Sequence, residues 1–240
     1  MKAFITGDTH GDMTRFRDIQ ECQSPMNMII ITGDAAFNFF GGKRDARVKD
    51  EAAKYPCYWY VYCGNHDMRP QDVAGMEQVY DERVKGWVYW EPKYPNIRYF
   101  FDYGIYTIDG YKCAVIGHGY SVDKFYRLAR HWTWHPDEQL NTQERYECLK
   151  LLQGQSFDFV LSHVVPYTSQ PFDAFLSSID QSTVDNTMEY WLEDVRDTID
   201  YKVWVAGHYH IDRIQEPKLE IFYRNFDSLD NIFQRWSPKI

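Results

Sequence analysis

Five short apolar runs recur along the sequence, and polar or turn residues separate them. Each run has the length and the β-branched or aromatic content of a buried strand. The expected strands cover residues 2–6 (KAFIT), 27–32 (NMIIIT), 57–63 (CYWYVYC), 157–162 (FDFVLS) and 201–206 (YKVWVA).

Helical patterns lie between several of these runs. They cover residues 12–22, 44–55, 136–153 and 183–199, and Ser182 or Thr183 is the expected N-cap of the last one. Because strands alternate with helices, the pattern predicts an α/β fold built in layers.

The stretch from residue 86 to residue 122 has a different pattern, typical of several short strands joined by turns. Within it, DYG at 102–104 and DG at 109–110 are typical of hairpin turns. We therefore expect antiparallel strands here, which extend the sheet or form a second one. Residues 165–182 have the composition of a long loop at the rim of a site. The sequence has no internal repeat, and we expect one domain over residues 1–240.

Composition narrows the class of protein. Hydrophobic residues make up 44% of the 240 positions and charged residues 25%, as in ordinary globular proteins. The net charge of −9 argues against broad, charge-driven binding to nucleic acid or acidic membranes. The five cysteines form no CxxC pair, which indicates reduced thiols in an intracellular protein. With no signal peptide and no apolar run of membrane length, we expect a cytoplasmic protein without a membrane partner.

Side chains that can bind a metal ion follow all five apolar runs, each after a small residue. In α/β sheets, ligands bind outside the carboxyl ends of the strands, so five such ends would bring these side chains together. The candidates, in chain order, are Asp8, His10, Asp34, Asn65, His66, Asp67, His163, His208 and His210.

The spacing within these groups suits metal binding. Residues i and i+2 of an extended chain point to the same side, about 6–7 Å apart, so Asp8 and His10 can bind one ion between them. His208 and His210 can do the same, or can serve two neighbouring ions. Carboxylate, imidazole and amide ligands together suit divalent ions such as Mn, Fe, Zn or Ni. The candidates are too many for one ion, and two ions that share a bridging carboxylate fit better.

The five groups GDTH, GD, GNHD, SH and GHYH resemble the motifs of the calcineurin-like metallophosphoesterase superfamily, in the family's order and over residues 7–210. The resemblance implies a four-layer α/β/β/α sandwich of mixed sheets, with two divalent metal ions at the strand ends and Mn²⁺ as the first choice. Segments 119–127 (GYSVDKFYR) and 132–140 (WTWHPDEQL) also resemble a stretch found in some bacterial and phage members.

The resemblance further implies a role for each candidate residue. One metal ion would take Asp8, His10, Asp34 and His210, and the other would take Asp34, Asn65, His163 and His208, with Asp34 as the bridge. His66 would lie over the substrate phosphate and protonate or stabilise the leaving oxygen. Asp67 would accept a hydrogen bond from the His66 imidazole and orient it.

The expected reaction is hydrolysis of a phosphate ester by a hydroxide held between two metal ions. Protein phosphatases of the superfamily carry GDxVDRG and GNHE, whereas this sequence has GDAAFN and GNHD and lacks the phosphate-binding Arg. The difference favours a small phosphodiester, with the nucleotide type as one candidate, over a phosphomonoester or a phosphoprotein. Two alternatives rank lower. A non-catalytic protein-binding scaffold is disfavoured because every ligand position is filled, and a nuclease for long DNA is disfavoured by the acidic charge.

Several histidines are open to two interpretations. His118 in IGHG is the rival of His163 as a ligand, but His163 follows the cleaner strand. His131 and His135 could stack on bases or bind a third metal ion. We prefer the interpretation that they anchor a helix that begins near Asp137.

The basic residues near the strand ends also allow two interpretations. Arg15 fits a site residue and a structural residue equally well. We expect Lys43, Arg44 and Arg47 to form the solvated start of a helix rather than a contact with substrate phosphate. The sequence does not determine the oligomeric state.

Overall fold

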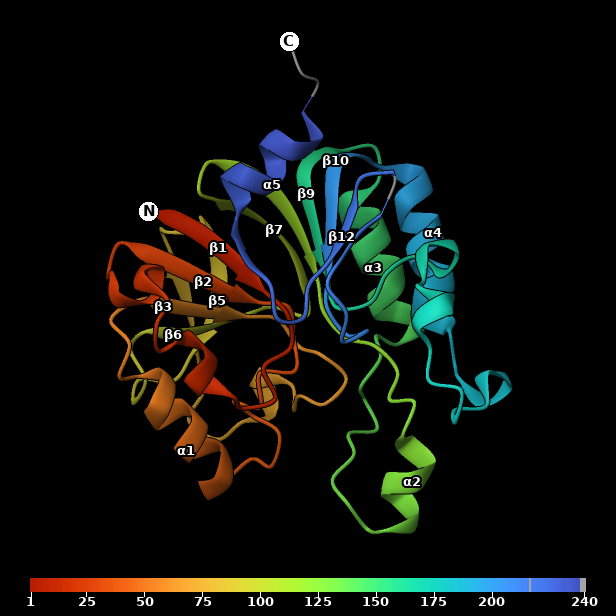
Figure 1. Cartoon of the computed structure of the whole chain (residues 1–240), viewed down its shortest axis with the longest axis horizontal. Coiled ribbons are helices and arrows are strands. Elements are labelled where there is room, and N and C mark those ends of the chain that lie inside the picture. The colour runs from red at the N-terminus through yellow and green to blue at the C-terminus, as the bar shows by residue number, and fades with distance from the viewer. Residues whose placement is uncertain (216, 238–240) are drawn as a thin grey trace.

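Two β-sheets pack face to face, and helices cover their outer faces (Figure 1). The computed structural model describes residues 1–215 and 217–237. The strands of the first sheet are β1 (Lys2–Thr6), β2 (Asn27–Ile31), β3 (Tyr58–Val61), β4 (Glu77–Asp81), β5 (Gly86–Trp90), β6 (Ile97–Phe100) and β13 (Phe226–Ser228). Those of the second are β7 (Tyr103–Ile108), β8 (Tyr111–Ile116), β9 (Ser156–Ser162), β10 (Asp200–Ala206), β11 (Arg213–Gln215) and β12 (Leu219–Ile221).

The α-helices are α1 (Lys43–Ala52), α2 (Lys124–Ala129), α3 (Thr142–Leu152), α4 (Thr187–Thr198) and α5 (Leu229–Trp236). All of them are short. Within the described part of the chain, no helix combines the length and the apolar character needed to cross a bilayer.

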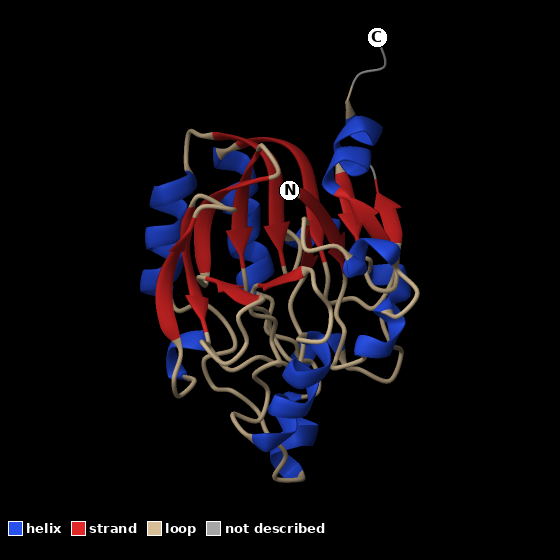
Figure 2. Ribbon diagram, turned by 90° about the vertical axis from the view of Figure 1, so that its left-hand side faces the viewer, coloured by secondary structure: helices blue, strands red, loops and turns tan. Residues whose placement is uncertain are grey.

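Both sheets are mixed. The strand orders are β13-β1-β2-β3-β6-β5-β4 and β11-β12-β10-β9-β8-β7. In each sheet four neighbouring strands run parallel, and the outer strands pair antiparallel with them or with each other. Many of the strand arrowheads point toward the same loop-rich end of the molecule (Figure 2). The carboxyl ends of the parallel strands therefore lie near one another.

Side chains alternate between the two faces of each strand and form three apolar layers, one between the sheets and one under the helices on each outer face. Two sheets and two helical layers around these cores confirm the expected four-layer α/β/β/α fold. In β2, Met28 and Ile30 enter the core between the sheets, whereas Ile29 and Ile31 pack in the layer that includes Ala52 of α1. Strands β9 and β10 likewise send alternate residues into the shared core and into the layer beneath α3 and α4.

The expected strands are all present, but the expected helix at 12–22 is wrong. The chain there forms two 3-10 helices, Met13–Phe16 and Gln20–Gln23. From the first of them, the Arg15 guanidinium donates hydrogen bonds to the carbonyl oxygens of Gly7, Asp8 and Tyr223. These contacts come from distant parts of the chain, so helical periodicity could not reveal them.

Two other helices begin later than expected, and for α3 the reason is a local side-chain cap. Helix α3 begins at Thr142, where Asn141 accepts hydrogen bonds from the backbone amides of Gln143 and Glu144. The N-cap of α4 is Asn186 rather than Ser182 or Thr183. Those two residues belong to a separate 3-10 turn (Gln181–Thr183), which the Asp180 side chain caps.

The segment 86–122 contains one of the two expected hairpin turns. The DG pair joins β7 to β8, with both residues at positive φ. The interpretation of DYG is wrong, because β6 belongs to the first sheet and β7 to the second. Residues 101–102 therefore carry the chain from one sheet to the other. Sequence patterns also missed β4 and, after residue 210, β11, β12, β13 and α5.

Glu189 on α4 makes the stability of the fold depend on pH. Its side chain is buried, and burial raises its pKa from 4.5 to about 7. Between pH 4.5 and 7 the unfolded chain therefore loses a proton that the folded protein keeps, and the free energy of unfolding falls. We predict that Glu189→Gln is more stable than the parent protein at pH 8, by about 3 kcal/mol at most.

Urea unfolding at pH 8 and at pH 4.5 checks this prediction. The advantage of the variant should shrink toward pH 4.5, where the folded parent keeps the proton of Glu189 and about half of the unfolded chains carry it as well. Glu77→Gln, on an exposed position of β4, is the matched control and should change little at either pH. An equal effect of Glu189→Gln at both pH values would contradict the prediction.

Candidate metal centre

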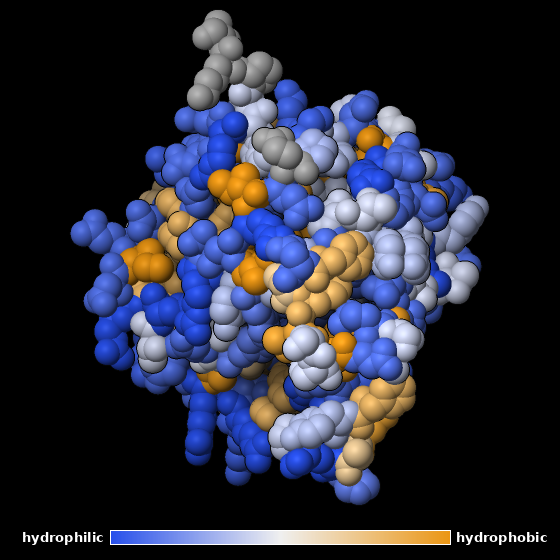
Figure 3. Space-filling view, turned by 45° about the vertical axis from the view of Figure 1, so that its right-hand side comes forward, coloured by the Kyte–Doolittle hydropathy of each residue, from blue (hydrophilic) through white to orange (hydrophobic). Residues whose placement is uncertain are grey.

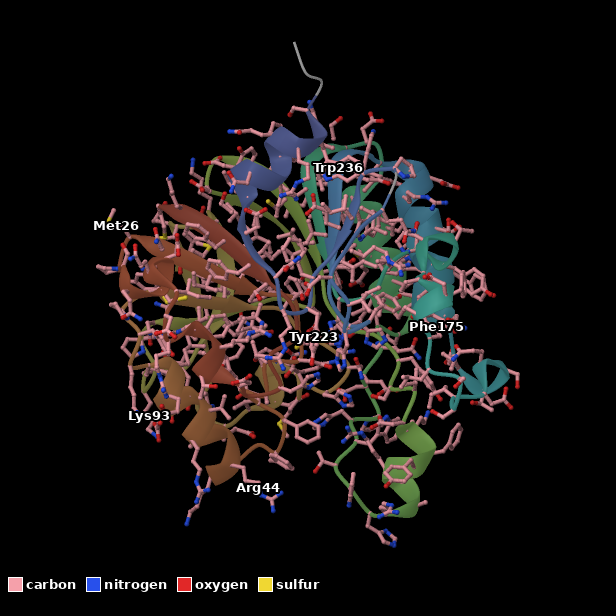
Figure 4. All side chains as sticks on the ribbon, in the orientation of Figure 1. Met26, Arg44, Lys93, Phe175, Tyr223 and Trp236 are labelled. Carbon is pink, nitrogen blue, oxygen red and sulfur yellow. The ribbon has the colours of Figure 1, made fainter. Side chains whose placement is uncertain are left out.

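The structure brings all nine candidate residues together where β1, β2, β3, β9 and β10 end. A continuous series of short contacts joins them, although they are spread over some two hundred positions of the sequence. The centre lies between the two sheets, beside Tyr223, which Figure 4 labels near the middle of the molecule. The ring of Tyr223 stacks on His210, with 4.7 Å between the centroids.

One half of the centre is built around the side-chain oxygen of Asn65. His163 Nε2 and His208 Nδ1 each lie 2.9 Å from Asn65 Oδ1. His163 Nδ1 lies 2.7 Å from the carbonyl oxygen of Thr32, which can only accept, so this nitrogen carries a proton and Nε2 is the atom that faces the centre. Nε2 points at the same amide oxygen as His208 Nδ1, so one cation could contact all three atoms.

The protonation of His208 supports the same conclusion. Burial, assisted by the neighbouring His163, lowers the pKa of His208 to about 3. The imidazole is therefore neutral at pH 7. Two imidazole nitrogens and one amide oxygen converge here, and this donor set fits a divalent transition metal ion.

The other half contains Asp8, His10 and His210. His10 Nε2 lies 2.9 Å from His210 Nε2, and His210 Nε2 lies 3.4 Å from Asp8 Oδ2. Burial raises the pKa of Asp8, but its hydrogen bond with His210 and the charge of His163 outweigh burial and lower the pKa. A carboxylate and two facing imidazole nitrogens again form a set of donors that a cation can satisfy.

Asp34 lies between the two halves. Its carboxylate Oδ2 is 3.9 Å from His163 Nε2, and Asp34, Asp8 and His163 form a buried group with ligand atoms within 4.8 Å of one another. Burial raises the pKa of Asp34, yet the charges of His66, His163 and His10 outweigh it and hold the pKa well below the usual range. This position suits a bridging carboxylate.

Backbone strain marks the same residues. His10, Asp34, His208 and His210 all have positive φ, between 45° and 68°, although none of them is glycine. Such left-handed conformations cost free energy for L-residues and tend to gather at functional sites. At each of these positions the chain turns sharply just after a strand, which directs the side chain into the centre.

His66 and Asp67 do not interact as expected. Asp67 Oδ2 accepts hydrogen bonds from the backbone amides of Asp34 (2.8 Å) and Gly64 (2.9 Å), and the described contacts include none between Asp67 and the His66 ring. Burial, together with the charge of Asp34, raises the pKa of Asp67 to about 7. The carboxyl of Asp67 thus holds two loops of the centre together, and the expectation that it orients His66 is corrected.

The His66 ring lies at the rim of the centre. Its centroid is 5.9 Å from that of His10 and 5.9 Å from that of Phe39. Burial lowers the pKa of His66, while the charge of Asp34 acts in the opposite direction. The described hydrogen bonds leave both ring nitrogens without a protein partner, so they are free to contact a bound molecule.

Sequence reasoning missed the residues that hold the ligands in place. Asn65 Nδ2 donates to Ser121 Oγ (3.0 Å), which turns the amide oxygen toward His163 and His208. Thr32 fixes the tautomer of His163 through its carbonyl oxygen. No motif signals such partners, because a serine or a backbone carbonyl acquires this role only through its position.

The structure also separates the open interpretations of the histidines. His118 Nε2 lies 2.9 Å from Asp102 Oδ1 and is not among the residues around Asn65. Although burial raises the pKa of Asp102, His118 and Arg69 outweigh it and lower the pKa to about 2. His135 Nε2 lies 3.0 Å from the carbonyl oxygen of Phe39, which fits an anchor rather than a metal ligand. The helix that it was expected to anchor begins only at residue 142.

The basic residues near the centre have structural contacts. Arg15 bonds to backbone carbonyls and to the Thr6 hydroxyl, which decides in favour of its structural interpretation. Lys43 and Arg44 begin α1, and the Arg44 guanidinium lies 4.7 Å from the centroid of the Phe40 ring. These positions agree with a helix start.

Comparison with known proteins places the chain in a family. The family model described as calcineurin-like phosphoesterase matches residues 1–212. The chain therefore belongs to the calcineurin-like phosphoesterases, and the family implies metal-dependent hydrolysis of phosphoesters. No curated protein matches the sequence. Among solved structures, one similar chain is a protein of unknown function from Aquifex aeolicus, at 12% identity over 98% of each chain and a TM-score of 0.46.

A substitution at Gly64 tests whether metal binding depends on the position of Asp34. A Cβ atom at this position would overlap the Asp34 carboxylate and its backbone amide. We predict that Gly64→Ala displaces Asp34 and weakens metal binding by about 10–100-fold or more, as when the support of a ligand is lost. Titration of the metal-free protein with Mn²⁺, followed by calorimetry, measures the change.

The matched control is Gly42→Ala at the start of α1. Nothing lies within 4 Å of a Cβ atom there, and the backbone is extended, so metal affinity should be unchanged. Circular dichroism verifies that both variants are folded. Parent-like affinity in a folded Gly64→Ala protein would show that Asp34 is not a ligand.

Proposed function

We propose that this protein is a phosphodiesterase that uses two divalent metal ions to hydrolyse a small diester of the nucleotide type. One observation supports the proposal above all others. Two buried carboxylates, Asp8 and Asp34, lie in one group with His163, with ligand atoms within 4.8 Å of one another, and further imidazole and amide donors face each other at 2.9 Å beside them. Such an arrangement is stable when cations occupy the space between the donors.

The ligands divide into two sets that share one carboxylate. Asp8, His10, Asp34 and His210 would hold one ion, and Asp34, Asn65, His163 and His208 would hold the other. The mixture of nitrogen and oxygen donors suits Mn²⁺ first, and also Fe, Zn²⁺ or Ni²⁺. When bound, such ions lower the pKa of water toward neutrality and offset negative charge on phosphoryl oxygens.

His66 is the residue proposed to act on the leaving group. Its ring nitrogens are free of protein hydrogen bonds, and the ring lies at the rim of the centre against His10 and Phe39. A positioned imidazole can donate a proton to the leaving oxygen of the ester. The Phe39 ring limits where His66 can turn, so the donor stays close to the centre.

The preference for a diester follows from charge. The loop after Asp34 carries Ala35 and Ala36 instead of an arginine, and Arg15 is occupied by backbone carbonyls. Without a free guanidinium at these positions, the doubly charged phosphate of a monoester has no added cation to bind. A singly charged diester needs less compensation.

We predict that His66→Ala retains its metal ions but has a kcat lower by about 10²–10⁴, the contribution typical of a general acid. Metal analysis and kinetics on one preparation measure both quantities. The loss should be larger for a dinucleotide, whose alkoxide is a poor leaving group, than for bis-p-nitrophenyl phosphate. A parent-like rate on the dinucleotide would remove His66 from this role.

We also predict a higher kcat/KM for bis-p-nitrophenyl phosphate than for p-nitrophenyl phosphate in the presence of Mn²⁺. Asp34→Asn should abolish metal binding and both activities together, which controls for a contaminating phosphatase. A strong preference for the monoester would overturn the diester proposal. Parent protein that binds no metal and hydrolyses neither compound would favour a non-catalytic scaffold.

A further inference from the structure

An arm of the chain, residues 121–135, projects beside the candidate centre, and we call it the α2 arm. It leaves the second sheet after β8 and contains α2, which extends below the body of the molecule in Figure 1. No residue of α2 is buried. The helix therefore adds nothing to a hydrophobic core, and its presence calls for another explanation.

The exposed residues of the α2 arm are aromatic and basic. Phe125, Tyr126 and Trp132 are all exposed, whereas much of the surface elsewhere is hydrophilic, with separate apolar areas (Figure 3). The arm carries Lys124, Arg127 and Arg130 against a single acidic residue, Asp123, although the whole chain has a net charge of −9. The arm is thus a local cationic surface on an acidic protein.

Aromatic rings and cations are interleaved along the arm. The guanidinium of Arg130 lies 4.5 Å from the ring centroid of Tyr126 and 5.8 Å from that of Trp132. The rings of Tyr126 and Trp132 meet edge to face, with 5.6 Å between their centroids. Flat π-faces beside positive charges suit a ligand that has both planar rings and phosphates.

The arm is joined directly to the candidate metal centre. At its beginning Ser121 accepts the hydrogen bond from the Asn65 amide, and at its end His135 contacts the Phe39 carbonyl. Between them, the Arg127 guanidinium lies 5.5 Å from the centroid of the Phe39 ring, which itself lies beside His66. A molecule bound along the arm would therefore lead into the centre.

We propose that the α2 arm binds single-stranded oligonucleotide, with bases stacked on Tyr126 and Trp132 and phosphates near Arg130 and Lys124. The inference rests on the proposed phosphodiesterase function and specifies its substrate. Base stacking on aromatic side chains tolerates any sequence, and lysine and arginine neutralise the backbone. The acidic charge of the rest of the chain confines such binding to the arm, so short single strands are favoured over long duplexes.

A second copy of the chain fits this surface less well. A symmetric dimer through the arm would place the same basic residues opposite one another, and like charges repel. A membrane would satisfy the charge and the aromatic residues, but it would not explain why the arm leads into a centre built for phosphoesters.

The test compares two pairs of aromatic residues. A double variant, Tyr126→Ala with Trp132→Ala, removes the pair on the arm. The matched control, Tyr80→Ala with Trp87→Ala, removes an edge-to-face pair on β4 and β5, at the edge of the first sheet. Trp132 is 52% exposed and Trp87 is 54% exposed, so both variants remove similar surface.

Fluorescence anisotropy of a short, labelled single-stranded DNA, measured without metal, gives Kd for each protein. We expect the arm variant to bind at least about tenfold more weakly, the effect of losing stacked bases, and the control variant to bind like the parent. Kinetics in Mn²⁺ add a second measurement. The fall in kcat/KM of the arm variant should be at least about tenfold larger for the oligonucleotide than for bis-p-nitrophenyl phosphate.

The outcomes separate the two proposals. Parent protein that binds the oligonucleotide but hydrolyses no diester would refute the phosphodiesterase proposal and leave the binding surface standing. Equal binding by the parent and the arm variant would overturn the inference about the arm. The inference about the arm would also be overturned if the parent protein did not bind the oligonucleotide but bound phosphatidylserine vesicles. The same holds if the parent protein did not bind the oligonucleotide and formed a dimer that the arm variant abolishes.

Discussion

Electrostatic repulsion between buried carboxylates is the interaction on which this structure depends. At the ends of five strands, Asp8 and Asp34 lie in one buried group, and four imidazoles and one amide oxygen converge around them. In the folded protein this arrangement is costly unless cations occupy the centre. The fold and the chemistry are therefore linked, because the residues that destabilise the metal-free centre are those that would bind metal ions.

The surrounding residues fix the direction in which each ligand points. Ser121 sets the orientation of the Asn65 amide, Thr32 sets the tautomer of His163, and Asp67 ties the loop of Asp34 to that of Gly64. Ser121 and Thr32 each act through one hydrogen bond and Asp67 acts through two, and losing any of them would leave a buried polar group unsatisfied. Rigidity in this outer layer keeps the ligand atoms in position before a cation binds.

The two sheets contribute unequally to the region around the centre. The first sheet supplies Asp8, His10, Asp34 and Asn65 from the loops after β1, β2 and β3, and the backbone of His10 and Asp34 is left-handed. The second sheet supplies His163, His208 and His210, and after β8 it also supplies the α2 arm. A rigid ligand set and a projecting aromatic arm thus begin from neighbouring strands, and Ser121 joins the arm to the ligand Asn65.

The sequence by itself determined the five strands that lead to the centre, the residues at their ends and the family, because apolar runs and short motifs are local signals. It singled out nine candidate residues that lie together in the structure, yet it misjudged the contact of Asp67, the starts of α3 and α4 and the helix at 12–22. Only the tertiary structure decided which atoms face each other, that DYG crosses between sheets, and that Ser121 and Thr32 support the ligands. The reason is physical: these features depend on contacts between residues far apart in the chain, and no local pattern of polar and apolar positions encodes the direction of a side chain.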